Sequence, residues 1–230
     1  EDKTQKYIDD HLIVISLKRT PHRLESFFKR NAHALGDWNV HVLDGVDGTQ
    51  HWELFKKSRL ISSNALNRWS PGAIGSALGH MLSWRLCQQL GKPILIAEDD
   101  VILAKELKHK LEILLKRKNH HHPFLLLGWN LDSVLQAELE PGLGLISLFE
   151  PAYPKEKQLT QLVNCKSERK ACKLKRCFGL PAYRITPETA KILLNQVNPL
   201  SSEPIAMGRG IPAHFSETLD GVLNNRYEKI

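Results

Sequence analysis

A short apolar run that ends in three carboxylates constrains the fold of this chain more than any other feature. Residues 93–97 read Pro-Ile-Leu-Ile-Ala, Glu98, Asp99 and Asp100 follow, and the chain is apolar again up to Leu103. Such a run is typical of a central strand in a parallel α/β sheet, where helices cover both faces. Because ligands bind beyond the carboxyl ends of these strands, we expect a buried strand whose end presents acid to a binding site.

The three carboxylates predict a site for a divalent cation. Adjacent carboxylates repel one another once they are desolvated, unless a positive ion compensates their charge. Mg²⁺ and Mn²⁺ prefer oxygen ligands and bridge readily to phosphates. The alternative is a solvated junction between a strand and a loop, where acids are also common.

Strands and helices alternate along the 230 residues. The sequence predicts strands at 12–17, 38–43, 93–98, 123–128 and 179–185, and helices near 24–28 and at 70–90, 106–118, 186–197 and 219–223. Residues 130–177 form the irregular part, with a hairpin expected near 142–149. This alternation predicts an α/β fold with an open, mostly parallel sheet flanked by helices, in a single domain.

The helix over residues 70–90 has clear end signals. Ser70 is a typical N-cap, Pro71 suits the first turn, and Gly91 ends the pattern. The glycines at its start lie inside a helical pattern, so they indicate close helix packing rather than a phosphate-binding loop.

Composition restricts the partners of the chain. The 32 Lys and Arg residues exceed the 25 Asp and Glu residues, for a net charge of +7, which favours an anionic partner such as a nucleotide, a phosphorylated glycan, an anionic membrane or nucleic acid. With four cysteines and no apolar run of membrane-spanning length, we expect a cytoplasmic protein. Cys165, Cys172 and Cys177 lack the close pair of familiar zinc sites, so thiols are favoured over a Zn²⁺ site.

Several blocks follow one another in a characteristic order and spacing: 14–19 with Arg23 downstream, 43–45, 70–80 and 96–101, and then 179–194 and the residues around Asp220. These blocks resemble glycosyltransferase family 25, which includes lipooligosaccharide and collagen galactosyltransferases. It implies a GT-A fold, a UDP-hexose donor, Mn²⁺ or Mg²⁺, and inversion at the anomeric carbon. Residues 1–128 would bind the nucleotide sugar, and residues 129–230 would bind the acceptor.

The resemblance also implies roles for the acidic residues. Glu98, Asp99 and Asp100 stand at the DxD-like motif of the family, with Glu in the first position. We expect Asp100 and Glu98 to bind the metal, Glu98 to lie nearer the ribose, and Asp99 to contact the donor. By analogy with a late His in GT-A enzymes, His214 is a third candidate ligand.

The opening block implies contacts with the nucleotide. It comprises Ser16, Leu17, Lys18 and Arg19, and it is followed by Arg23. Arg23 could equally be a solvated helix residue.

Two further positions match donor-site blocks of the family. They are Asp44, after the second strand, and His80, on the long helix. A lone helical His is more often a packed residue than a ligand.

An inverting transfer also needs a base for the proton of the acceptor hydroxyl. Asp220 stands where the family carries a late acidic residue, and Asp132 follows a predicted strand, so these two are the candidates. Either could instead cap a helix.

The sequence thus favours a hexosyltransferase, with galactose ahead of glucose, acting on a lipooligosaccharide or lipopolysaccharide glycan. Peripheral contact with the cytoplasmic face of the inner membrane is expected. The alternative is an inactive transferase-like protein that binds a glycan or a partner. Dispersed basic residues argue against a nucleic-acid-binding module, and the lack of clustered ligands for a second metal argues against a phosphohydrolase.

Overall fold

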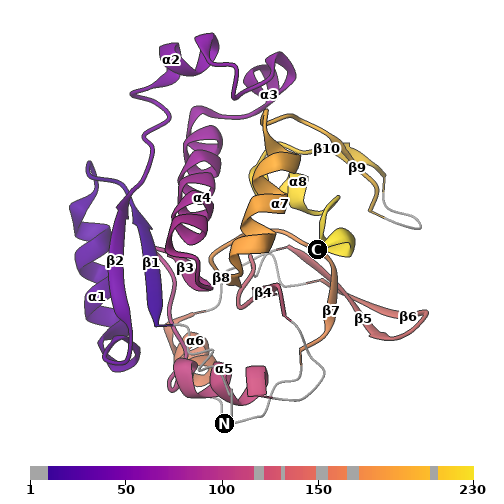
Figure 1. Ribbon diagram of the computed structural model, residues 1–230. Coiled ribbons are helices and arrows are strands. Elements are labelled where there is room, and N and C mark those ends of the chain that lie inside the picture. The colour runs from indigo at the N-terminus through magenta and orange to yellow at the C-terminus, as the bar shows by residue number, and fades with distance from the viewer. Residues whose placement is uncertain (1–9, 117–121, 131–132, 149–154, 165–170, 208–211) are drawn as a thin grey trace.

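A mixed five-stranded sheet in the order β2-β1-β3-β8-β4 lies at the centre of the molecule (Figure 1). The computed structural model describes residues 10–116, 122–130, 133–148, 155–164, 171–207 and 212–230. The central strands are β1 (His11–Ser16), β2 (Asn39–Asp44), β3 (Ile94–Glu98), β4 (Phe124–Leu126) and β8 (Ala182–Ile185). All five strands were predicted from the apolar pattern.

One strand reverses the expected direction. β1 pairs parallel with β2 and β3, whereas β8 runs antiparallel to both of its neighbours, β3 and β4. The chain leaves β4 at the edge of the sheet where β3 also ends and enters β8 from that same edge. No crossover is therefore needed between β4 and β8, and an antiparallel pair results. The predicted mostly parallel sheet is correct for the other strands and wrong for β8.

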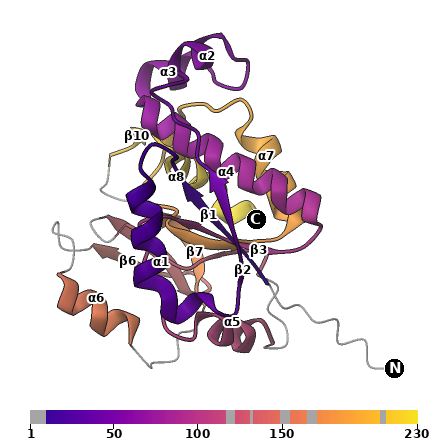
Figure 2. The same cartoon turned by 90° about the vertical axis from the view of Figure 1, so that its left-hand side faces the viewer.

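Helices cover both faces of this sheet (Figures 1 and 2). One face carries α4 (Pro71–Leu90), α7 (Pro187–Val197) and α8 (Leu219–Leu223), and the other carries α1 (Pro21–Leu35) and α5 (Leu107–Lys116). Alternate residues of each strand enter opposite cores: Ile13 and Ile96 pack with α4, whereas Leu12 and Leu95 pack with α1. Successive side chains of a strand point to opposite faces, so the buried runs of the sequence supply both cores.

The long helix α4 has the predicted ends. The Ser70 side chain accepts a hydrogen bond from the Ala73 backbone N–H, and Gly91 ends the helix with a left-handed φ of 61°. A Cβ on Gly75 would clash with the Val46 carbonyl oxygen, and one on Gly79 would lie 3.2 Å from Ile15. The glycines therefore let α4 pack closely on β1 and on the loop after β2, as predicted.

Most of the remaining elements lie beyond β4 or around the N-terminus of α4, whereas α6 (Glu156–Val163) lies near the loop between β3 and α5, where the Lys105 N–H donates to the Val163 carbonyl oxygen at 3.4 Å (Figure 1). Apart from α6, they are the three-stranded sheet of β5 (Val134–Glu140), β6 (Leu143–Leu148) and β7 (Lys173–Cys177), the pair β9 (Pro204–Ile205) and β10 (His214–Phe215), α2 (Trp52–Lys57), α3 (Ser63–Arg68), and a 3-10 helix at Tyr227–Lys229. The hairpin near 142–149 is confirmed by β5 and β6. The stretch expected to be irregular also contains α6 and β7.

Two sequence expectations bear on compartment and cysteine chemistry. Within the described residues, none of the helices combines the length and the apolar character needed to cross a membrane. Cys87, Cys172 and Cys177 are thiols, and Cys165 lies outside the described residues.

Candidate functional site

Three parallel strands bring predicted residues to one edge of the sheet. In the strand register, Ser16 at the end of β1 lies beside Asp44 at the end of β2. On the other side of β1, Ile15 lies beside Glu98 at the end of β3. The carboxyl ends of these strands therefore form one continuous edge, where ligands of open α/β sheets bind. The part of it that carries Glu98, Asp99 and Asp100 is called the acidic edge below.

Asp99 holds this edge together. Its side chain is only 6% exposed, and its two carboxylate oxygens accept hydrogen bonds from Ser16 Oγ at 2.7 Å and from Arg23 Nε at 2.8 Å. The backbone oxygen of Asp99 accepts from Arg30 Nη2 at 2.6 Å. Both carboxylate oxygens thus serve to hold β1 and α1 against the loop after β3.

Asn31 fixes the same loop further along. Its amide donates to the Val101 carbonyl oxygen at 3.0 Å and accepts from the Leu103 N–H at 2.7 Å. Helix α1 therefore determines the course of the acidic loop over several residues.

The other two carboxylates remain open to a ligand. The Asp100 side chain is 60% exposed and accepts from Arg23 Nη2 at 3.0 Å, and the Glu98 side chain is 34% exposed. Partial desolvation and the neighbouring Glu98 charge raise the pKa of Asp100, although Arg23 opposes them. Arg23 pairs with two of the three carboxylates, Asp99 and Asp100. The carboxylates Glu98, Asp99 and Asp100 thus outnumber the arginine that pairs with them, and this excess negative charge suits a cation.

A buried chain of hydrogen bonds reaches Glu98 from α4. Trp84 Nε1, which can only donate, lies 2.8 Å from the Tyr183 hydroxyl oxygen, and that hydroxyl lies 3.0 Å from His80 Nδ1. Burial raises the pKa of Tyr183 well above its usual value, so the phenol keeps its proton. Because Trp84 donates to the hydroxyl oxygen, we assign the hydroxyl as the donor to Nδ1.

This donor assignment fixes the tautomer of His80. Its proton then lies on Nε2, 3.4 Å from Glu98 Oε1. His80 is 2% exposed, so it is a packed histidine that also faces the acidic edge.

The predicted basic residues at this edge form ion pairs. Lys18 Nζ lies 2.5 Å from Asp44 Oδ2, and Arg19 Nε lies 2.6 Å from Asp47 Oδ2. Leu17 accepts the Thr20 N–H in the turn that starts α1. Lys18 and Arg19 thus lie beside the acidic edge, where Asp44 and Asp47 balance their charges.

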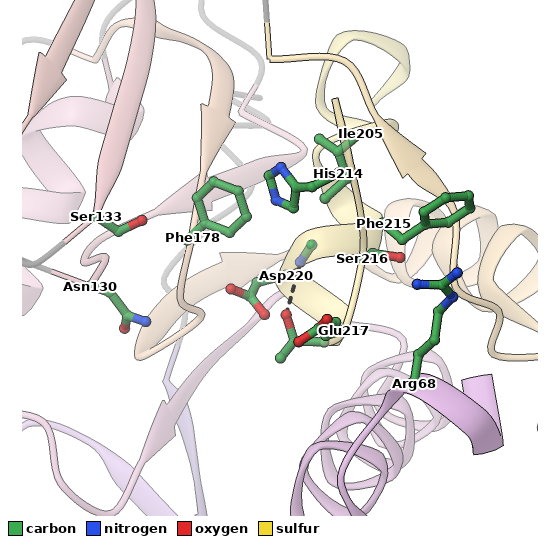
Figure 3. A pocket seen from close by; sticks show the side chains of 12 residues that line it. Arg68, Asn130, Ser133, Phe178, Ile205, His214, Phe215, Ser216, Glu217 and Asp220 are labelled. Atoms are coloured by element: carbon green, nitrogen blue, oxygen red, sulfur yellow. Dashed lines mark hydrogen bonds between the residues drawn. The ribbon is translucent and has the colours of Figure 1, made fainter. Parts of the chain in front are cut away.

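A cavity of about 750 Å³ lies beyond the acidic edge (Figure 3). Its walls combine two phenyl rings and an imidazole with amide, hydroxyl, carboxylate and guanidinium groups. The lining residues are Arg68, Asn130, Ser133, Phe178, Ile205, His214, Phe215, Ser216, Glu217, Thr218, Asp220 and Gly221.

Asp220 is held in this cavity by the backbone before β8. Its Oδ2 accepts a hydrogen bond from the Gly179 N–H at 2.6 Å. Gly179 has a φ of 90°, and a Cβ there would clash with the Asn130 side chain, so only glycine fits. Asn130 in turn donates its N–H to the Phe178 carbonyl oxygen at 2.9 Å.

The acidic edge and the cavity are neighbours along the chain leading into β8. The Glu98 N–H donates to the Pro181 carbonyl oxygen at 2.9 Å, two residues after the Gly179 that holds Asp220. Antiparallel β8 thus begins between the two regions. The acidic edge and the candidate base Asp220 are therefore joined by the segment that leads into β8.

The predicted metal ligands do not form one cluster. His214 lies on β10, lines the cavity and stacks on Phe178 with ring centroids 5.9 Å apart. Among the residues that the structure describes, no three His, Cys, Asp or Glu side chains are grouped as a metal site. Of the three predicted metal ligands, Glu98 and Asp100 therefore remain as candidate oxygen ligands, and His214 is not grouped with them. The second base candidate, Asp132, lies outside the described residues.

Sequence reasoning missed three contributors to these regions. Tyr183 was expected only as a strand residue and Gly179 as the start of a strand, and no role was assigned to Arg68. The one signal available for Gly179 was a glycine at a strand entrance, where an unusual φ is common. The roles of Arg68 and Tyr183 depend on residues far away in sequence, which no local pattern shows.

The fold and the edge define an α/β protein that binds its ligand beyond the carboxyl ends of parallel strands. A family model matches residues 9–207, and the chain accordingly belongs to glycosyltransferase family 25 (LPS biosynthesis protein). Membership makes the chain a transferase enzyme and implies a GT-A-like fold. The matched residues include the acidic edge and end before His214 and Asp220. Comparison with curated proteins finds no match.

Proposed function

We propose that this chain is an inverting, metal-dependent hexosyltransferase. It would move a hexose, galactose first and glucose next, from a UDP-sugar to a lipooligosaccharide or lipopolysaccharide glycan. The observation that carries the proposal is the junction described above, in which β8 links the carboxylates after β3 to the cavity that contains Asp220. Residues 1–128 supply the donor region, and residues 129–230 supply most of the acceptor region.

The acidic edge fits a divalent cation, Mn²⁺ or Mg²⁺. Glu98 and Asp100 would hold it, because both carboxylate oxygens of Asp99 already accept hydrogen bonds from Ser16 and Arg23. Desolvation first, and then the neighbouring charge of Glu98, raises the pKa of Asp100, and a bound cation would offset both by favouring the ionised carboxylate. When bound, the ion offsets the negative charge that develops on the diphosphate leaving group.

The chain's own residues would orient the donor. Asp99 and Asn31 fix the loop that carries Asp100, and the His80 contact restrains Glu98. Arg23 bridges Asp99 and Asp100 while its side chain is 45% exposed, so it is the proposed cation beside the diphosphate. Stabilisation of charge on a leaving group by groups held in place is a major source of rate enhancement.

Asp220 is the proposed base. One carboxylate oxygen is occupied by the Gly179 N–H, which leaves the other to accept the proton of the acceptor hydroxyl. In a single displacement, the acceptor oxygen forms a bond to the anomeric carbon as the bond from that carbon to the β-phosphate oxygen breaks. The electron pair leaves with UDP, the proton goes to Asp220, and the anomeric configuration inverts.

Calorimetric titration with UDP, with and without Mn²⁺, tests the donor assignment. We expect binding that depends on Mn²⁺ and that Asp100→Ala abolishes. Glu140→Ala, which removes an exposed carboxylate on the hairpin, is the matched control and should bind as the wild type does. A panel of UDP-sugars with lipooligosaccharide then identifies the donor.

The alternative function gives a different result. An inactive transferase-like protein would bind a glycan without transferring sugar from any member of the panel. Absence of UDP binding under both conditions would contradict the donor assignment. A glycolipid acceptor would meet the enzyme by peripheral contact at the cytoplasmic face of the inner membrane, which the net charge of +7 favours.

A further inference from the structure

Arg68 occupies an unusual position at the rim of the cavity. It ends α3, and its guanidinium carbon lies 4.2 Å from the centroid of the Phe215 ring on β10 (Figure 3). Within the described residues, this stacking is the interaction that the Arg68 side chain makes, and no carboxylate pairs with it. The planar group therefore keeps its N–H donors for a ligand.

The surrounding structure sets where Arg68 lies. Trp69 Nε1 donates to the Ser216 carbonyl oxygen at 2.8 Å, and the Asn64 amide donates to the Ser202 carbonyl oxygen at 3.1 Å. Both bonds tie α3 to the segment that carries β9 and β10. Arg68 is thus positioned over Phe215 by hydrogen bonds of its neighbours, so little ordering is required when a ligand binds.

Charge is distributed unevenly around the cavity. Arg68 is the one Lys or Arg among the described residues that line it, whereas Glu217 and Asp220 supply carboxylates. Figure 3 shows Arg68 and Phe215 together on one side, and Asp220 with Asn130 on the other. A ligand that spans the cavity would therefore meet a cation at one end and a proton acceptor at the other.

We propose that this cavity selects an acceptor sugar that carries an anionic group, a carboxylate or a phosphate. Arg68 would bind that group through its fork of N–H donors. The reacting hydroxyl would lie at Asp220, and the rings of Phe178 and Phe215 would pack on the C–H faces of the sugar. The proposal rests on the proposed function, because it assigns the acceptor end of the same site.

Titration of the full chain with three monosaccharides tests this proposal. The probes are galacturonate, galactose 6-phosphate and uncharged galactose. Ligand-observed NMR measures the binding of each. One or both anions should bind about tenfold more tightly than galactose, because one charge-assisted hydrogen bond contributes about that factor in affinity. Preference for galacturonate alone identifies a carboxylate, and preference for galactose 6-phosphate alone identifies a phosphate.

Matched variants assign the preference to Arg68. Arg68→Gln should reduce the affinity for the anions to that for galactose and leave galactose binding unchanged. Arg59→Gln removes the same charge from an exposed position outside the cavity lining and should keep the preference. Phe215→Leu should give an intermediate loss, because the guanidinium is then no longer stacked.

Two results would overturn the proposal. One is equal binding of all three sugars by the wild type, and the other is an anion preference that survives Arg68→Gln. UDP titration with Mn²⁺ on the same samples separates this failure from that of the proposed function. A protein that binds UDP but shows no anion preference is still a donor-binding transferase.

Discussion

The acidic edge and the Asp220 cavity differ in how their side chains are held. At the edge, Asp99 is buried and bonded to β1 and α1, and Glu98 is contacted by a hydrogen-bonded chain from α4. In the cavity, Arg68 and His214 are exposed side chains that stack on the neighbouring rings of Phe215 and Phe178. A site on regular elements is precise, whereas a site on loops and short elements adapts. The comparison indicates that buried hydrogen bonds hold the proposed donor region, whereas the proposed acceptor region presents exposed side chains on a backbone that is itself held in place.

The largest expected effect separates the two regions by function. Asp220→Asn keeps the size of the side chain but removes the proposed base, so the rate of transfer should fall by about a thousandfold. Binding of UDP with Mn²⁺ should not change, because the acidic edge is intact. Single-turnover assays and calorimetry on the same preparation measure the two quantities. Normal turnover would place the base elsewhere.

The next effect concerns stability and compares two adjacent carboxylates. Asp99→Ala leaves Ser16 and Arg23 without their acceptor, so unfolding should require about 2 kcal/mol less free energy. Asp100→Ala, on the same loop but exposed, should have little effect on stability. Urea denaturation of both variants measures the difference, and equal stabilities would show that Asp99 does not hold the edge.

A tenfold effect on UDP affinity is expected from His80, the last member of the hydrogen-bonded chain that reaches Glu98. His80→Asn retains a group near the Tyr183 hydroxyl but loses the contact with Glu98, whereas His80→Gln can place an amide N–H near Nε2. Affinity for UDP with Mn²⁺ should fall about tenfold in the Asn variant and be largely restored in the Gln variant, as is typical of groups that orient metal ligands. Calorimetry measures both affinities. The same loss in both variants would indicate a purely packing role.

The smallest effect is a pH-dependent gain in stability. The pKa of Asp100 is raised in the folded protein, so ionisation of this carboxylate opposes folding. Asp100→Asn should therefore match the wild type below the ordinary Asp pKa of about 3.9. It should become more stable as pH rises through the raised folded pKa, and stay so at neutral pH.

Solvent limits the size of this gain. The Asp100 side chain is 60% exposed, so we expect about 0.5 kcal/mol. Thermal melts at pH 3 and pH 7 measure it. A variant less stable than the wild type at pH 7 would show that the Arg23 contact outweighs the repulsion.

Much of the fold could be predicted from the sequence, because its signals are local. The buried run before Glu98 gives β3, and Ser70 with Gly91 gives the ends of α4. The direction of β8 could not be predicted, since it depends on which edge the chain returns to after residues 129–181. Helix α6 lies in residues 130–177, which the sequence analysis predicted to be irregular.

The candidate site could be predicted less completely. Local sequence identified Glu98, Asp99 and Asp100 as a group, but it could not distinguish the buried Asp99 from the exposed Asp100. That difference arises from Ser16 and Arg23, 83 and 76 residues away. The role of Tyr183 depends in the same way on Trp84 and His80, which lie on another element.

The junction between the two regions consists largely of peptide groups. The Glu98 N–H meets the Pro181 carbonyl oxygen, and the Gly179 N–H meets the Asp220 carboxylate, so of the cavity-wall side chains these two bonds use that of Asp220. Selection can therefore change other wall residues while these two bonds are inherited unchanged. A library randomised at Arg68, Phe215 and Glu217 should retain the thermal stability of the parent and diverge in acceptor choice. In evolutionary terms, this junction would let the side chains of the proposed acceptor region be replaced while the proposed donor region is kept.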